Sequence, residues 1–174
     1  MADWVIFAVA SAGIVAFSWP SLSRPRSHGF FRFFAFEAIV GLLVLNVRHW
    51  FDDPLSPLHI VAWALLAASL ALAIHGFIIL PRAGRAEGWF ENTTVIVQRG
   101  AYRFIRHPLY ASLLFLGWGA FLKHPDLLTA ILVGAATLFL VATGKADEAE
   151  CLEKFGESYA AYMKTTKMFI PYIF

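Results

Sequence analysis

Long apolar segments separated by short polar ones dominate the pattern of this chain. They cover about residues 4–20, 33–51, 58–80, 109–122 and 127–143. A transmembrane helix needs about 20 apolar residues. The fourth segment is shorter and lies close to the fifth, which predicts a tight helical hairpin. We therefore expect an all-α integral membrane protein with five transmembrane helices, built as a single domain over residues 1–174.

The composition agrees with this class. Hydrophobic residues make up 59% of the chain and charged residues 15%, whereas soluble domains carry about 25% charged residues. The length leaves no room for a separate soluble catalytic domain, so helix ends and loops must form any active site. The first apolar segment begins almost at Met1, with no basic region before it and no cleavage motif after it. We interpret it as a retained span.

Basic residues are distributed unevenly over the predicted loops. With five spans, the loops 21–32 and 81–108 and the C-terminal tail share one side and hold all basic residues except Arg48 and Lys123. Basic loops stay in the cytosol. We therefore expect an external N-terminus, a cytosolic helical tail and an active site facing the cytosol, as in a prokaryotic inner membrane. The net charge of +2 gives no reason to expect a nucleic-acid partner.

The densest basic cluster, "RFIRHPLY" at residues 103–110, stands directly before an apolar helix. Proline is favoured in the first turn of a helix, so the helix should begin at Pro108. Its free N–H groups would then lie beside Arg106 and His107, an arrangement that binds carboxylates and phosphates. The alternative is that the cluster only anchors the chain at the membrane surface, which explains Arg103 equally well.

The tail carries a carboxylate at the head of an apolar helical stripe. The stripe has helical spacing and consists of Glu148, Leu152, Phe155, Tyr159 and Tyr162. Glu148 could instead lie at a solvated helix start, where acids are favourable, and Gly156 could break the helix. With the basic cluster, Asp147, Glu148 and the tyrosines would suit a zwitterionic ligand with a flat ring. S-adenosylmethionine meets that description, and so could a nucleotide such as NADPH.

The motif "GAYRFIRHPLY", followed by "DEAECLEKFGESYAAY" and "FIP", resembles the isoprenylcysteine carboxyl methyltransferase and phospholipid methyltransferase superfamily over residues 93–171. The resemblance implies an S-adenosylmethionine-dependent methyltransferase whose cytosolic pocket is made by the last two spans and the tail. Asp147 takes the first acidic position of the motif, and Ala101 replaces the usual proline. The residues implied to bind the cofactor are Val97, Gly100, Tyr102, Arg106, His107, Tyr110, Asp147, Glu148 and Tyr159.

The resemblance implies a small lipophilic methyl acceptor, similar to an isoprenylcysteine carboxylate or a phospholipid. Many relatives have an arginine at the position of Met168, so carboxyl methylation is less expected here. We place Trp118, Tyr162 and Met168 on the acceptor side and identify no catalytic residue. A lipophilic channel is one interpretation of the aromatic residues, and an interfacial belt is the other; these residues are Trp89, Phe90, Phe115 and Trp118.

Two other functions stay open at this point: an NADPH-dependent reductase of the membrane sterol reductase type, and a non-catalytic binding or assembly factor. Glu37 and His75 lie within predicted spans, where ionisable residues are costly and often functional, and they could pair. The histidines His49, His59 and His75 lack the spacing of metal ligands, so we expect no metal.

Overall fold

The computed structural model describes residues 2–88 and 91–174. The described residues form helices and two short 3₁₀ turns, η1 (Val47–His49) and η2 (Gly100–Arg103), and they contain no strand. The helices are α1 (Ala2–Leu22), α2 (His28–Asn46), α3 (Pro57–Ala83), α4 (Pro108–Phe121), α5 (Leu127–Phe155) and α6 (Glu157–Thr165). The all-α prediction is confirmed. Within the described residues, α1, α2, α3 and α5 are long and apolar enough to cross a membrane, and α4 is a shorter apolar helix.

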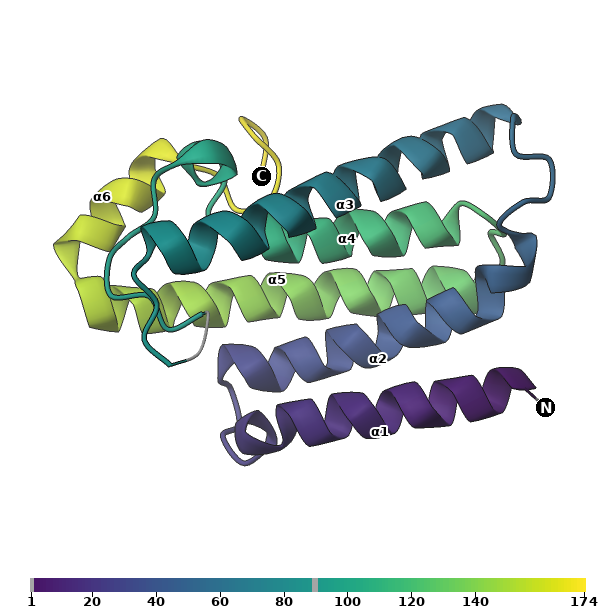
Figure 1. Ribbon diagram of the computed structural model, residues 1–174, viewed down its shortest axis with the longest axis horizontal. Helices are drawn as coiled ribbons and strands as arrows, with labels where there is room; N and C mark the ends of the chain where they lie inside the picture. Colours follow the sequence, from purple (N-terminus) through teal and green to yellow (C-terminus); the bar gives the residue numbers. More distant parts are fainter. Residues whose placement is uncertain (1, 89–90) are drawn as a thin grey trace.

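Helices α1 to α5 lie side by side in the order α1, α2, α5, α4, α3, with their axes roughly aligned (Figure 1). Helix α2 packs against α1 and α5, while α4 packs against α3 and α5. Helix α6, the α1–α2 turn and the connection from α3 to α4 gather at one end of the bundle, and the N-terminus lies at the other. Polar segments that are distant in the sequence therefore meet at one end.

The core of the bundle is made where small and branched side chains of neighbouring helices meet. Its centre is formed by Ala35, Ala38, Ile39, Ile105, Tyr110, Ala111, Ala136, Leu140, Met168 and Phe169. Small residues let helix backbones approach closely, which is the main way that helices associate inside a membrane. By contrast, α1 and α3 expose large apolar side chains such as Val9 and Leu70, as lipid-facing helices do.

The second helix differs from its predicted range of 33–51. It begins at His28, because the Ser27 hydroxyl caps it by accepting a hydrogen bond from the Phe30 N–H at 3.2 Å. Serine is among the preferred residues at this position, whereas the prediction started at the first long apolar run. The correction matters because it places His28 and Arg32 on α2 rather than in a loop.

The fifth helix also differs from its prediction, since it continues past residue 143 to Phe155. A helix of 29 residues is about 44 Å long at 1.5 Å per residue, which exceeds the roughly 30 Å hydrocarbon core. Its last turns can therefore carry Asp147 and Glu148 to the membrane surface. Gly156 ends the helix with a φ of +56°, so the predicted continuous stripe is divided between α5 and α6.

The C-terminal tail contains the helix α6, as the sequence suggested, but the chain leaves the helix at Thr166, whose backbone is extended. Lys167 pairs in parallel with Ile105, and the Arg106 N–H donates to the Lys167 carbonyl at 2.8 Å. The His107 N–H donates to the Met168 carbonyl at 3.2 Å. These bonds satisfy backbone groups just before α4 and fix the Arg106-His107-Pro108 unit against the tail.

Candidate active site

A cavity of about 680 Å³ opens at the end of the bundle where the polar segments meet. Small-molecule sites usually have volumes of about 300–1,000 Å³. The walls come from the C-terminal end of α1, the start of α2, the connection from α3 to α4, the start of α4, the end of α5, and α6. Charged side chains in these walls are Arg24, His28, Arg32, Glu91, Arg106, His107, Asp147, Glu150 and Lys154. The cavity therefore combines apolar surface with many convergent polar groups.

The turn η2 brings the chain into the cavity wall just before α4. Gly100 has a φ of +58°, a conformation that favours glycine. A Cβ atom at this position would lie 2.1 Å from Nε2 of His75, so no larger side chain fits. His75 Nε2 in turn accepts a hydrogen bond from the Ala101 N–H at 3.0 Å. Gly100 and His75 together therefore determine the course of the backbone that leads to Tyr102 and His107.

His107 lies between two carboxylates of α5. Its Nδ1 is 3.4 Å from Oδ2 of Asp147, and its Nε2 is 3.3 Å from Oε1 of Glu148. Burial by itself lowers the pKa of His107, but hydrogen bonding to Asp147 and Glu148 outweighs this effect, so the pKa of His107 is raised. The two carboxylates therefore favour the protonated form of this buried ring and hold it at the N-terminus of α4.

Arg106 makes the strongest connection between α5 and the tail. Its Nε donates to Oε1 of Glu148 at 2.6 Å, and its Nη1 donates to the Thr166 carbonyl at 2.5 Å. A charged hydrogen bond of this kind typically contributes about 1.5–3 kcal/mol. The guanidinium thus lines the cavity while its donors hold the protein together. Glu148 lies behind it and does not line the cavity.

Four tyrosines line the cavity around this unit. The Tyr110 ring stacks on the His107 ring, with centroids 5.3 Å apart. The Tyr162 hydroxyl donates to the Tyr102 carbonyl at 2.6 Å, which ties α6 to η2. The Tyr159 and Tyr162 rings meet edge to face. Flat aromatic faces beside charged groups are suited to a ligand that has both a ring and charged ends.

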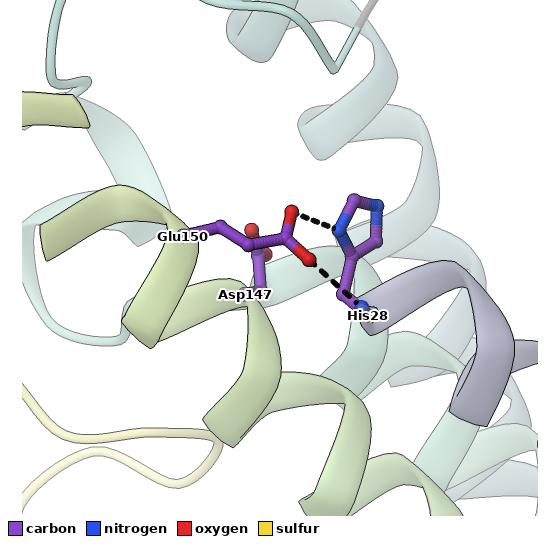
Figure 2. A group of neighbouring side chains, drawn as sticks. All are labelled: His28, Asp147 and Glu150. Carbon is purple, nitrogen blue, oxygen red and sulfur yellow. Dashed lines mark hydrogen bonds and ion pairs between the residues drawn. The ribbon is translucent and has the colours of Figure 1, made fainter. Parts of the chain in front are cut away.

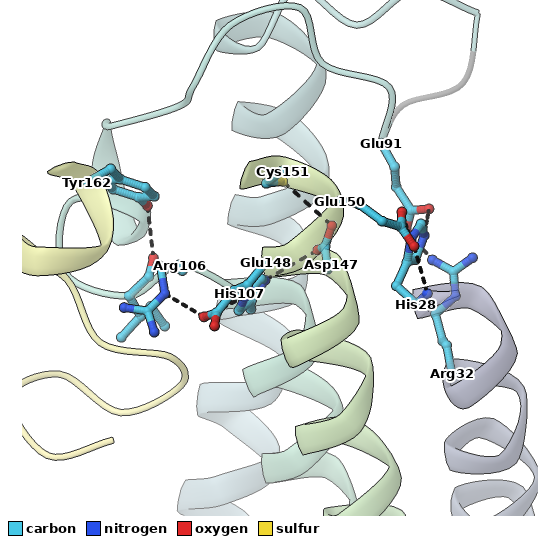
Figure 3. Close-up of polar contacts among 11 residues, drawn as sticks. His28, Arg32, Glu91, Arg106, His107, Asp147, Glu148, Glu150, Cys151 and Tyr162 are labelled. Atoms are coloured by element: carbon cyan, nitrogen blue, oxygen red, sulfur yellow. Dashed lines mark hydrogen bonds and ion pairs between the residues drawn. The ribbon is translucent and has the colours of Figure 1, made fainter. Parts of the chain in front are cut away.

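A second polar cluster lies on the α2 side of α5 (Figure 3). His28 Nδ1 is 2.6 Å from Oε2 of Glu150, and the His28 N–H donates to the other oxygen of that carboxylate at 3.0 Å. Arg32 Nη1 forms an ion pair with Glu91. Burial works against ionisation of Glu91, but His28 and Arg32 lower its pKa. The sequence analysis missed all four residues of this cluster.

His28, Asp147 and Glu150 offer one ligand atom each within 4.8 Å of one another (Figure 2). Such a set could hold a divalent cation, but Figure 2 shows both oxygens of Glu150 engaged by His28. The histidines considered in the sequence are not among these three. The expectation of no metal stays a prediction.

Comparisons with known proteins match the part of the chain that carries His107 and its carboxylate partners. Residues 57–158 match the phospholipid methyltransferase family. The chain belongs to this family. It is also similar to a methanethiol S-methyltransferase from Pseudomonas deceptionensis, with 31% identity over 145 residues, which cover 78% of this chain and 48% of the relative. The chain thus spans about half the length of that relative.

Membership of the phospholipid methyltransferase family confirms the resemblance found in the motifs, and together with the apolar helices it identifies an integral membrane protein. The matched residues include η2, α4 and all of α5. They therefore contain the first polar cluster, with Arg106, His107, Asp147 and Glu148. His28 and Arg32 on α2 lie outside the matched residues.

The structure brings most of the expected binding residues together. The predicted residues that line the cavity are Val97, Tyr102, Arg106, His107, Tyr110, Asp147, Tyr159 and Tyr162. Gly100 and Glu148 do not line the cavity. Gly100 shapes the backbone of η2, and Glu148 holds the Arg106 side chain. The ligand-binding roles of all these residues stay predictions at this point.

Two residues expected on the acceptor side lie elsewhere. Met168 packs in the hydrophobic core beside Phe169, because the extended tail turns it inward. Trp118 lies ten residues into α4, is partly exposed, and donates to the Thr137 hydroxyl at 3.2 Å. Neither residue lines the cavity. Trp89 and Phe90, suggested for a lipophilic channel, fall outside the described residues.

The possible Glu37–His75 pair is not formed. Glu37 on α2 accepts a hydrogen bond from the Ser11 hydroxyl of α1, and His75 is engaged by η2. Glu37 therefore connects the two N-terminal helices, while His75 supports the approach to the site.

Proposed function

We propose that this protein is an integral membrane methyltransferase that uses S-adenosylmethionine and transfers the methyl group to a small lipophilic acceptor. The observation that carries the proposal is the first polar cluster: a buried His107 held between Asp147 and Glu148, at a helix N-terminus, in the wall of a cavity lined by tyrosines. This cluster lies within the residues that match the phospholipid methyltransferase family. The name of the similar methanethiol S-methyltransferase agrees with the same chemistry.

The residues present fit S-adenosylmethionine. The cofactor carries a carboxylate, an ammonium, a ribose and a flat base, and it supplies an electrophilic methyl group on a sulfonium. The free N–H groups at the N-terminus of α4 would hold the carboxylate, beside the His107 ring that Asp147 and Glu148 keep in place. Asp147 would hold the ammonium or the ribose hydroxyls. Val97, Tyr102, Tyr110 and Tyr159 would contact the base.

The protein contributes orientation and exclusion of water. Alignment of two reactants in a water-poor site can supply a large share of a rate enhancement. Here the tail bonds to Arg106 and His107, and the Tyr162–Tyr102 bond, hold the walls of the cavity in place. We place Tyr162 between the cofactor and the acceptor, since it lines the cavity next to Arg106.

We also propose that the cavity faces the cytosol in a prokaryotic inner membrane, with the N-terminus outside and five crossings. The cavity end of the bundle carries the basic loops and the tail, which favours the cytosolic side. Helix α4 has 14 residues and is about 21 Å long. It would cross together with the turn that follows Phe121, in a bilayer that is locally thinned around it.

Titration of the purified full-length chain in detergent tests the cofactor. We expect calorimetry to show binding of S-adenosylmethionine and of S-adenosylhomocysteine, with no heat from NADPH. Binding of NADPH alone would favour a reductase of the sterol reductase type. Absence of binding with all three compounds would leave a non-catalytic binding or assembly factor.

A further inference from the structure

One wall of the cavity contains none of the residues that we assign to the cofactor. It is formed by α1 and α2, and it contributes Phe17, Pro20, Ser21, Arg24, His28 and Arg32. Figure 3 shows His28 and Arg32 on α2, across α5 from Arg106. This wall lies outside the residues 57–158 that match the family. If family members share a cofactor and differ in their acceptors, a wall outside the match is the place for acceptor selection.

Arg32 is the notable side chain in this wall. Its exposed fraction is 7%, and its guanidinium carbon lies 5.4 Å from the Phe17 ring centroid and 5.8 Å from that of Phe36. Arginine cannot lose its proton in a protein, so a permanent positive charge lies between two aromatic rings and the polar cluster that contains Glu91. Such a placement is costly unless the charge has partners.

The partners in the described structure leave Arg32 incompletely satisfied. Nη1 is paired with Glu91, and Glu91 is shared with His28, whose Nε2 lies 3.8 Å away. The Nε of Arg32 is buried and has no hydrogen-bond partner among the described residues. An unsatisfied donor in a buried guanidinium needs an explanation. A negatively charged ligand in the cavity would not reach the enclosed Nε, but it would balance the charge of the guanidinium.

The charge of the loaded cavity also favours an anionic acceptor. The basic side chains of the cavity wall are Arg24, His28, Arg32, Arg106, His107 and Lys154, the acidic ones are Glu91, Asp147 and Glu150, and Glu148 lies behind Arg106. S-adenosylmethionine has two positive groups and one negative group, so it would leave the site positive. A protonated amine would then meet a repulsive wall, whereas an anion would complete the charge balance.

We propose that Arg32 is the acceptor-binding residue of this protein and that its acceptor is a small thiol, bound as the thiolate. The inference rests on the proposed function. Phe17, Pro20 and Leu80 would contact the alkyl group of the thiol, and the cofactor would occupy the rest of the cavity, which limits the size of the acceptor. The name of the methanethiol S-methyltransferase relative directs the choice of thiol among small anions.

The reaction then needs no catalytic base. The thiol loses its proton to water, and Arg32 favours the charged form by lowering the pKa of the bound thiol. The thiolate sulfur forms a bond to the methyl carbon as the carbon–sulfonium bond breaks. The electron pair of the broken bond stays on the departing sulfur, which gives S-adenosylhomocysteine and a neutral methyl thioether.

Arg32→Gln tests the assignment, with Arg103→Gln as the matched control, since Arg103 is exposed and does not line this cavity. Ethanethiol is the acceptor probe. We expect Arg32→Gln to bind S-adenosylmethionine within about twofold of the parent and to raise the KM for ethanethiol roughly tenfold or more, as for a lost charged hydrogen bond. The pH of half-maximal kcat/KM should move upward, because the bound thiol would ionise less readily.

A second variant distinguishes the loss of acceptor binding from a folding defect. Arg32→Gln alone leaves Glu91 without its arginine, whereas Arg32→Gln with Glu91→Gln removes both charges. The double variant should also keep cofactor affinity and show the raised KM. Arg32→Lys, which retains the charge but not the planar fork, should lie between the parent and Arg32→Gln.

Several results would overturn the assignment while leaving the proposed function intact. One is loss of S-adenosylmethionine affinity in the double variant, which would place Arg32 on the cofactor side. Another is methylation of phosphatidylethanolamine or of a farnesylcysteine carboxylate by the parent, with no methylation of ethanethiol. Failure of the parent to bind S-adenosylmethionine would instead refute the proposed function, and this inference with it.

Discussion

At the scale of single residues, the candidate site separates groups that face the ligand from groups that hold them. His107 lines the cavity and is buried between Asp147 and Glu148. Arg106 also lines it, yet its guanidinium is engaged by Glu148 and by the Thr166 carbonyl. The basic cluster before α4 therefore contains one ligand-facing cation, one connecting cation, and the exposed Arg103.

His107→Ala should weaken binding of S-adenosylmethionine roughly tenfold or more, since it removes the ring that positions Asp147 beside the N-terminus of α4 and leaves both carboxylates without this partner. Arg103→Ala should change the affinity by less than about twofold. Calorimetry on the purified variants measures both. Equal affinities for parent and His107→Ala would show that the cluster serves only as a membrane anchor.

The raised pKa of His107 also predicts a pH dependence of stability. A group with a higher pKa in the folded state stabilises the protein fully below its unfolded pKa of about 6.5, and this contribution is lost as the pH rises through the folded pKa. The melting temperature of the parent should therefore fall from pH 6 toward pH 9 more steeply than that of His107→Gln. Parallel curves for the two proteins would contradict a raised pKa.

At the scale of elements, the tail is the part that positions the site. Its carbonyls accept the N–H groups of Arg106 and His107. Phe169 is fully buried, and its ring contacts the His107 ring at a centroid distance of 6.1 Å. The tail thus connects the hydrophobic core directly to the start of α4.

Phe169→Ala should lower the melting temperature by several degrees, since removal of a buried phenylalanine typically costs about 3–5 kcal/mol. It should also weaken binding of S-adenosylmethionine, because the tail would hold His107 less firmly. Tyr172→Ala is the control, as this tail residue is 83% exposed and should affect neither measurement. An unchanged affinity in a destabilised Phe169→Ala protein would show that the tail does not position the site.

At the scale of the whole molecule, the arrangement has two unlike ends. Helix α6, the α1–α2 turn and the connection from α3 to α4 lie at one end, and the N-terminus lies at the other (Figure 1). The cavity is lined from the first of these ends. This separation is what a membrane protein with a one-sided site requires. It agrees with the orientation that the basic residues predict.

Reporter fusions test that orientation. A fusion after Phe174 should report the cytosol, and an insertion at Asp53, between η1 and α3, should report the outside. The physical reason is that five crossings place these positions on opposite faces. The same side for both would exclude the five-span arrangement and with it the cytosolic cavity.

The sequence by itself determined the features that depend on local pattern. Apolar runs revealed the helices, because each membrane-spanning helix satisfies its own backbone hydrogen bonds. Pro108 marked the start of α4, since its ring suits a first helical turn. The motif around Arg106 and His107 also identified the family. Two helix limits were wrong where a cap or a solvated helix end, rather than hydropathy, set them: the start of α2 and the end of α5.

Only the tertiary structure decided which distant residues meet. His28 and Glu150 are 122 positions apart, and the Arg32–Glu91 pair joins α2 to a loop, so neither contact has a local signal. The structure also turned Met168 into the core and gave Arg106 a carboxylate partner. The physical reason is that ion pairs and tail packing depend on how the helices are arranged side by side. Hydropathy defines each helix separately and does not encode that arrangement.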